Sequence, residues 1–333
     1  MKILVTGGAG YIGGTVAGVL AEKGHEAVVF DNLSHGRREL IPAGVGFVEG
    51  ELADRQALER LFISAKEQGK PFDGVLHFAA LIEAGESMVR PEIFFRNNTA
   101  STLSLLEAIL AHGPRRLVFS STAAVYGEPE SVPIQEDAKL LPTNAYGESK
   151  LLVEHMLGWL NRIHGLRYAS LRYFNVAGAP EGPGGVTRGE AHEPESHLIP
   201  LVLDVALGRR KSIKIFGEDY PTADGSCIRD YIHVSDLADA HLLALDALDR
   251  HDRLIYNLGN GKGFSVREVI ESARRVTGHP IPAEVCSRRA GDPAVLIASS
   301  EKAIRELGWK PKYTQLDEIV RTAWIWHQKR YAK

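Results

Sequence analysis

The chain of 333 residues has few cysteines, no long apolar run and little excess charge of either sign. Its two cysteines, Cys227 and Cys286, could form at most one bridge, which excludes a disulfide framework and fits a reducing cytoplasm. No run approaches 18 apolar residues, so we expect no membrane span. The net charge of -3 argues against a nucleic-acid binder, because such proteins carry a basic surplus or patch.

The first half of the chain alternates short apolar strands with helical patterns. Apolar strands that do not alternate with polar residues are typical of a parallel sheet covered on both faces. This pattern predicts an α/β fold with a Rossmann-type doubly wound parallel sheet. Strands are expected at 2–5, 27–30, 45–48, 74–78, 116–120 and 168–172, and helices at 12–23, 56–68, 97–111 and 146–163.

The pattern changes after Phe174. Residues 178–197 are broken by glycine and proline and predict a long surface loop, a type of segment that often covers a site. A helix at 198–208 and a strand at 213–216 follow, and the α/β pattern returns near 230–249 and 254–258. We therefore predict a sheet domain at 1–175 plus about 230–262, and a smaller mixed α/β substrate-binding domain at 176–229 and 263–333.

Three glycines separate the first strand from the first helix. Gly7, Gly10 and Gly13 follow a G-x-x-G-x-x-G pattern, which suits a tight turn that brings backbone N–H groups to a pyrophosphate. Asp31 ends the second strand, where a carboxylate can accept hydrogen bonds from an adenosine ribose and would repel a 2′-phosphate. The pattern therefore favours NAD over NADP. The structural alternatives are that the glycines form a plain strand–helix turn and that Asp31 only starts a local turn.

Tyr146 and Lys150 stand four residues apart and share one helix face. A nearby ammonium favours a phenolate, so we expect Lys150 to lower the pKa of Tyr146 from about 10 and make it a general base. The preceding strand ends in hydroxyl side chains, Ser120 to Thr122, at the sheet edge where open α/β folds bind ligands. The structural alternatives are an aromatic residue at a helix start and a strand-end hydroxyl bonded to backbone.

These motifs together resemble the extended short-chain dehydrogenase/reductase family, and the whole chain resembles its UDP-glucose (UDP-galactose) 4-epimerases. Blocks beyond the glycine turn carry the resemblance, and the last two belong to the sugar-nucleotide part of that family. They are HFAAL at 77–81, SSTAAVYG at 120–127, AYGESK at 145–150, LRYFNVAGA at 171–179, HLIP at 197–200, IFGEDYPTADGSCIRDYIHVSDLADAH at 215–241 and RRAGDPA at 288–294.

The resemblance implies a role for each matching position. Thr122, Tyr146 and Lys150 would be catalytic. NAD would be held by Gly7, Gly10, Tyr11, Ile12, Gly13, Asp31, Asn32, Glu51, Leu52, Phe78, Ala79, Ala80, Asn97, Ser120, Tyr146, Lys150 and Tyr173. The UDP-hexose would be held by Thr122, Asn175, His197, Leu198, Phe216, Arg229, Arg289 and Asp292.

The resemblance also implies the reaction. Tyr146 would remove the proton of the sugar 4-hydroxyl while hydride passes from C4 to NAD; the 4-keto sugar would turn over and be reduced from its other face. No metal is required. A homodimer through the helices at 97–111 and 146–163 is implied as well.

Four positions depart from the family pattern. Ile82 stands where many members have a lysine near the cofactor, Thr122 replaces a commoner serine, and His197 stands where some members carry asparagine. Leu296 is intermediate in size at a position that separates hexose-specific enzymes from those accepting N-acetyl sugars.

Several other functions remain open. A 4-epimerase of a UDP-N-acetylhexosamine, UDP-pentose or UDP-uronate would share these motifs. A 4,6-dehydratase would need an acidic pair beside Thr122, where Ala123 and Ala124 stand. A simple NAD-linked dehydrogenase would leave the sugar-nucleotide blocks unexplained, and intact catalytic residues speak against a non-catalytic NAD-sensing module. We expect the cluster of Glu190, His192, Glu193, Glu195 and His197 to be solvated and without metal, and Cys227 to be a small buried residue.

Overall fold

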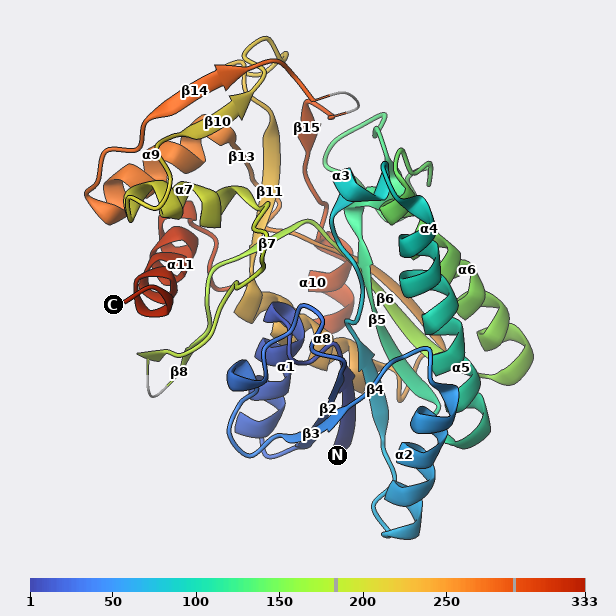
Figure 1. Cartoon of the computed structure of the whole chain (residues 1–333). Helices are drawn as coiled ribbons and strands as arrows, with labels where there is room; N and C mark the ends of the chain where they lie inside the picture. The colour runs from blue at the N-terminus through green and yellow to red at the C-terminus, as the bar shows by residue number, and fades with distance from the viewer. Residues whose placement is uncertain (183–184, 290–291, 333) are drawn as a thin grey trace.

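The computed structural model describes residues 1–182, 185–289 and 292–332. Its largest element is a sheet of seven strands in the order β12-β6-β5-β4-β1-β2-β3, in which every neighbouring pair is parallel (Figure 1). The strands are β1 (Lys2–Thr6), β2 (Glu26–Asp31), β3 (Gly46–Glu49), β4 (Gly74–His77), β5 (Arg116–Thr122), β6 (Arg167–Tyr173) and β12 (Arg253–Leu258). The predicted doubly wound fold and its six strands are confirmed, and the strand expected at 254–258 is the seventh.

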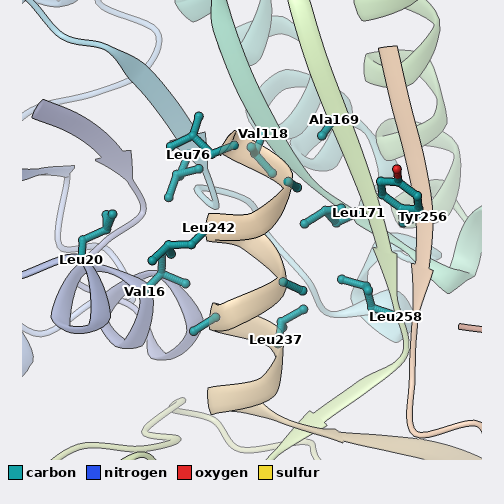
Figure 2. Packing of buried hydrophobic residues seen from close by; sticks show 14 of the residues in the cluster. Val16, Leu20, Leu76, Val118, Ala169, Leu171, Leu237, Leu242, Tyr256 and Leu258 are labelled. Carbon is teal, nitrogen blue, oxygen red and sulfur yellow. The ribbon is translucent and has the colours of Figure 1, made fainter. Parts of the chain in front are cut away.

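Helices cover both faces of this sheet. On one face, α1 (Tyr11–Glu22) and α8 (Val234–Ala247) pack on Ile3 and Val5. Figure 2 shows Leu237 and Leu242 of α8 in this core. On the other, α2 (Arg55–Glu67), α5 (Ser101–His112) and α6 (Ala145–His164) pack on the intervening Leu4. Successive strand residues point to opposite faces, so a sheet buried on both sides needs an unbroken apolar run.

The helix expected at 97–111 begins differently from the prediction. A π-helical segment, Phe95–Ala100, precedes α5, and it places the buried Asn98 where its side chain bonds both backbone groups of Leu81, at 2.8 and 2.9 Å. Two short helices, α3 (Ala84–Ser87) and α4 (Pro91–Phe94), lie just before it. Helix α6 follows the prediction closely: the Asn144 side chain caps its first turn and Gly165 ends it in the left-handed conformation.

A second, smaller layer lies beyond the carboxyl ends of the large sheet (Figure 1). Strand β11 (Ile228–His233) pairs with β7 (Asn175–Ala177), β13 (Gly263–Ser265) and β15 (Val295–Leu296). The other elements here are α7 (Leu198–Ala206), β10 (Ile213–Phe216), α9 (Val266–Thr277), β14 (Ala283–Cys286) and α11 (Leu316–Arg330), while α10 (Glu301–Leu307) lies near α8 and β12. Helices α7, α9 and α11 share one apolar core.

In the described residues of the segment expected to be a long loop, the regular elements are the short pair β8 (Glu181–Gly182) and β9 (Gly185–Val186). The division into two domains stays a prediction; β12 lies in the large sheet and β11 in the smaller one. Among the described residues, no helix is long and apolar enough to cross a membrane.

Candidate functional site

The glycine turn joins β1 to α1 under tight steric constraint. Gly7 has φ +72°, and a Cβ there would lie 2.5 Å from the backbone nitrogen of Ala79. A Cβ on Gly13 would lie 2.4 Å from the carbonyl oxygen of Gly7. Larger side chains are therefore excluded, and the N–H groups that begin α1 after Gly10 face the adjoining cleft, where they suit a pyrophosphate.

Asp31 is buried where β2 ends, and it organises the neighbouring backbone. Its carboxylate accepts hydrogen bonds from the N–H groups of Ala9, at 3.0 Å, and Leu33, at 2.8 Å. The next residue, Asn32, donates to Glu51 at 3.0 and 3.1 Å. A ribose would meet acceptors on the loops that follow two adjacent strands, as the sequence pattern predicts.

The candidate catalytic side chains come from α6 and from the end of β5. The Tyr146 hydroxyl bonds the Thr122 side chain. One helical turn later, the Lys150 ammonium donates to the backbone carbonyl of Ser120 at 2.9 Å. The Ser120 hydroxyl in turn bonds the Tyr173 hydroxyl. The structure thus brings together the hydroxyl and ammonium groups that the sequence singled out.

Burial sets the protonation of this group. Burial is the largest effect on Tyr146 and raises its pKa to about 12. The hydrogen bond to Thr122 opposes this rise, and the charge of Glu83 adds to it. Burial also lowers the pKa of Lys150 to about 7. The expectation that Lys150 lowers the pKa of Tyr146 is therefore wrong for the protein without its cofactor, because burial disfavours the charged phenolate.

A cavity of about 320 Å³ runs along the carboxyl edge of the large sheet. Every residue predicted to hold NAD lines it except Lys150, which lies behind Ser120. We name this cavity the cofactor cleft. Thr122 lines it too, together with Ile82, so an apolar side chain replaces the lysine of many family members.

A second cavity, of about 480 Å³, adjoins the first and is named here the substrate cleft. Arg229 pairs with Asp292, and the Arg289 guanidinium stacks 4.0 Å from the ring centre of Phe216. Two cations and an aromatic wall suit a diphosphate joined to a flat base.

The cleft is also lined by Asn175, His197 and Leu198, whereas Thr122 lies in the cofactor cleft only. Asn175, Tyr11 and His197 line both cavities, so the two clefts meet.

Residues 187–197, the cleft loop, form part of both walls. Its Glu190 lines both clefts and His192 the cofactor cleft. The side chains of Glu190 and Glu195 are only 12% exposed, so the expectation of a solvated cluster is wrong for these two residues. Glu193 is more exposed and pairs with Arg37 at 2.8 Å. The sequence pointed to the loop through its glycines and prolines, but not to its burial.

Two remaining sequence expectations can be placed. Cys227 is buried as predicted and lines the substrate cleft, and Cys286 is a free thiol on β14. Leu296 lies on β15 with its Cα opposite Arg229, and packs against the small apolar cluster of Val125 and Ile134.

Comparison with known proteins places the chain in a family. Residues 3–259 match the NAD dependent epimerase/dehydratase family. The UDP-glucose 4-epimerase of Streptomyces lividans is 55% identical over 98% of this chain and 96% of its own, and that of Halalkalibacterium halodurans is 53% identical over 99% and 96%. The Brucella ovis UDP-glucose 4-epimerase in complex with NAD superimposes with a TM-score of 0.91 at 43% identity, covering 97% of both chains. The Bifidobacterium longum enzyme in complex with NAD+ and UDP also gives a TM-score of 0.91, at 37% identity over 99% of both chains. The chain therefore belongs to the NAD dependent epimerase/dehydratase family and, within it, to the UDP-glucose 4-epimerases.

Proposed function

We propose that this chain interconverts UDP-glucose and UDP-galactose with NAD as its cofactor. One observation carries the proposal: Thr122 and Tyr146, with Lys150 behind them, line the cofactor cleft, and this cleft meets a second cleft with cations and an aromatic wall. Relatives named UDP-glucose 4-epimerase share about half of the sequence over nearly the full length.

The residues of the cofactor cleft fit NAD. The glycine turn has no room for a Cβ at Gly7 or Gly13, so its backbone packs closely beside the cleft, and Asp31 and Glu51 present carboxylates to the adenosine end. Ser120, Tyr146 and Tyr173 line the same cleft, and Asn175, two residues after Tyr173, lines both clefts. NAD, when bound, accepts the hydride of sugar C4 and returns it, and its positive nicotinamide favours the Tyr146 phenolate.

The proton transfers belong to the chain. Tyr146 takes the proton of the sugar 4-hydroxyl and returns it when the 4-keto sugar is reduced. Thr122, bonded to Tyr146, holds the same oxygen in position. Lys150 donates to the Ser120 carbonyl, and in its charged form it lowers the cost of a phenolate one helical turn away.

Inversion requires that the nucleotide stays bound while the hexose changes face. Arg229, Arg289 and Phe216 would hold the UDP group at the far end of the substrate cleft. Binding energy spent on this remote group keeps the reacting sugar in place without fixing the orientation of its ring. Hydride can then return to the opposite face of the 4-keto sugar.

The assembly and compartment belong to the same proposal. Trp159 and Ile163 of α6 are 58% and 64% exposed, and Leu103 of α5 is 42% exposed. Exposed large apolar residues on two adjacent helices suit a homodimer in which these helices pack together. We propose that the enzyme is a cytoplasmic homodimer. A light-scattering mass of a single chain would contradict the dimer.

A substrate panel tests the proposed activity. The purified chain is given NAD and, in separate reactions, UDP-galactose, UDP-N-acetylgalactosamine, a UDP-pentose and a UDP-uronate, and products are separated chromatographically. We expect the fastest conversion with UDP-galactose. Faster conversion of another sugar would move the assignment to that sugar, and Leu296 is the first residue to vary. Bound NAD without turnover of any sugar would instead support a sensing module.

A further inference from the structure

Three potential metal ligands meet in the wall between the two clefts. Among the described residues, Glu190, His192 and His197 each offer a ligand atom, and these atoms all lie within 4.8 Å of one another. The His192 Nδ1 lies 2.5 Å from Glu190 Oε1, and the His197 Nδ1 lies 3.9 Å from Glu190 Oε2. Glu195 lies beside this group of three, with its Oε1 2.8 Å from His197 Nδ1. All four residues belong to the cleft loop.

Each carboxylate uses one oxygen to fix the local backbone. Glu190 Oε1 accepts from the N–H groups of Ala191 and His192, at 2.9 and 3.2 Å. Glu195 Oε1 accepts from those of Ser196 and His197, both at 2.8 Å. Hydrogen bonds of this kind orient ligand carboxylates in metal sites, and they leave the second oxygen of each group for another partner.

One buried atom beside the cluster lacks such a partner. Glu195 Oε2 is a buried side-chain atom that makes no hydrogen bond, whereas His192 Nδ1 faces Glu190 Oε1 at 2.5 Å. Buried polar atoms without partners are rare, because leaving one unsatisfied costs about 1–3 kcal/mol. A cation among Glu190, His192 and His197 would balance the charge of the two neighbouring carboxylates, Glu190 and Glu195.

The loop backbone is held from a distant helix. The Trp326 indole N–H donates to the Glu190 carbonyl at 2.7 Å. Arg330 donates to the carbonyls of Glu190 and Ala191, at 3.2 and 3.1 Å. Trp326 and Arg330 both belong to α11, so this helix fixes the loop backbone at Glu190 and Ala191.

We propose that Glu190, His192 and His197 bind one divalent transition-metal ion of the zinc class. Two imidazoles and one carboxylate are donors that zinc accepts, with water in the fourth position of a tetrahedral site. The ion braces the wall shared by the two clefts, and the proton and hydride transfers do not pass through it. The proposal stands apart from the proposed activity and can fail without it.

Metal binding is measured on full-length protein without a histidine tag. The protein is treated with a chelator, dialysed, and titrated with zinc chloride against a colorimetric chelator, with magnesium chloride as a parallel titration. We expect one zinc per chain and no competition from magnesium, because magnesium prefers an all-oxygen octahedral site. Cobalt(II) in place of zinc should give the intense visible absorption of tetrahedral coordination.

Three variants separate a metal site from an ion-pair cluster. His192→Ala and Glu190→Gln should each weaken zinc binding by at least about 100-fold, since even residues behind the ligands commonly change affinity 10–100-fold. Glu193→Gln, in the same loop but outside the donor set, should bind as tightly as the unmodified chain. Circular dichroism of each variant checks folding, and His192→Gln serves if His192→Ala unfolds. Equal zinc affinity in all of these proteins, or no zinc bound by the unmodified chain, overturns the proposal.

Discussion

The Lys150 ammonium donates to the backbone carbonyl of Ser120 at 2.9 Å, from a fully buried position behind the cofactor cleft. This bond ties α6 to the end of β5. Tyr146 lies one turn earlier on the helix, and Thr122 two residues further along the strand, so the same bond aligns the two hydroxyl groups. Lys150 is therefore a positioning residue as well as a nearby charge.

Replacing Tyr146 with phenylalanine removes the group that exchanges the sugar proton. We expect kcat for UDP-galactose to fall by about 10²–10⁴, the usual contribution of a positioned acid or base. The thermal midpoint should change little, because only one oxygen is lost. Tyr331→Phe, at the carboxyl end of α11 and outside both clefts, is the matched control. Near-normal turnover in Tyr146→Phe would remove Tyr146 from the mechanism.

The stability of the protein should depend on pH through Lys150. Burial lowers its pKa from 10.5 to about 7. Between these values the unfolded chain binds one more proton at this side chain than the folded chain, so stability from this group rises with pH, by at most about 1.4 kcal/mol per unit. Below about pH 7 the contribution levels off.

Urea unfolding from pH 6 to 10, without added NAD, measures this dependence. The free energy of unfolding of the unmodified chain minus that of Lys150→Met should grow more positive above about pH 7. Lys66→Met, an exposed lysine on α2, should show no such trend. A flat difference for Lys150→Met would mean that Lys150 stays charged in the folded protein.

Arg289 should contribute to substrate binding more than to chemistry. Its guanidinium stacks on Phe216 within the substrate cleft. A charge-assisted hydrogen bond is worth about 1.5–3 kcal/mol, so Arg289→Ala should raise KM for the UDP-sugar by about tenfold to hundredfold with little change in kcat. The neighbouring Arg288 pairs with Asp219 outside the cleft, and Arg288→Ala should leave KM unchanged. Equal effects of the two variants would place the diphosphate elsewhere.

The buried ion pair of Glu154 and Arg172 should be a major determinant of stability. Both side chains are at most 5% exposed, and Glu154 accepts from Arg172 at 2.6 and 2.9 Å and from Ser121 at 2.6 Å. Glu154→Gln leaves a buried guanidinium without its counter-charge, which costs about 3–5 kcal/mol. We expect a loss of that size in urea unfolding.

An exposed pair supplies the comparison. Arg55 and Glu59 form an i,i+4 pair on α2 whose side chains are 47% and 23% exposed, against at most 5% in the buried pair. Exposed pairs of this kind contribute about 0–1 kcal/mol, so Glu59→Gln should change the free energy of unfolding by no more than that. A similar loss in both variants would show that the buried pair has no special role.

Local sequence patterns were enough to predict the sheet and much of the site. Apolar runs at the spacing of β1, β2 and β4 need burial on both faces, and this requirement alone predicts a doubly wound sheet. The glycine turn and the Tyr146–Lys150 spacing are likewise local, because a strand–turn–helix and a single helix turn decide their geometry. The π-helical segment before α5 was not predictable, since it depends on Asn98 reaching the backbone of Leu81, 17 residues away.

By itself, the amino-acid sequence determined the elements, the order of the glycines and the face shared by Tyr146 and Lys150. Only the tertiary structure decided their environment. Burial, supplied by elements distant in sequence, raises the pKa of Tyr146 and lowers that of Lys150. Contacts from Trp326 and Arg330, more than 130 residues along the chain, turn a glycine- and proline-broken segment into a buried wall. The spacing of apolar residues predicts which face of a helix or strand is buried. The desolvation of a side chain depends on which other elements pack over it.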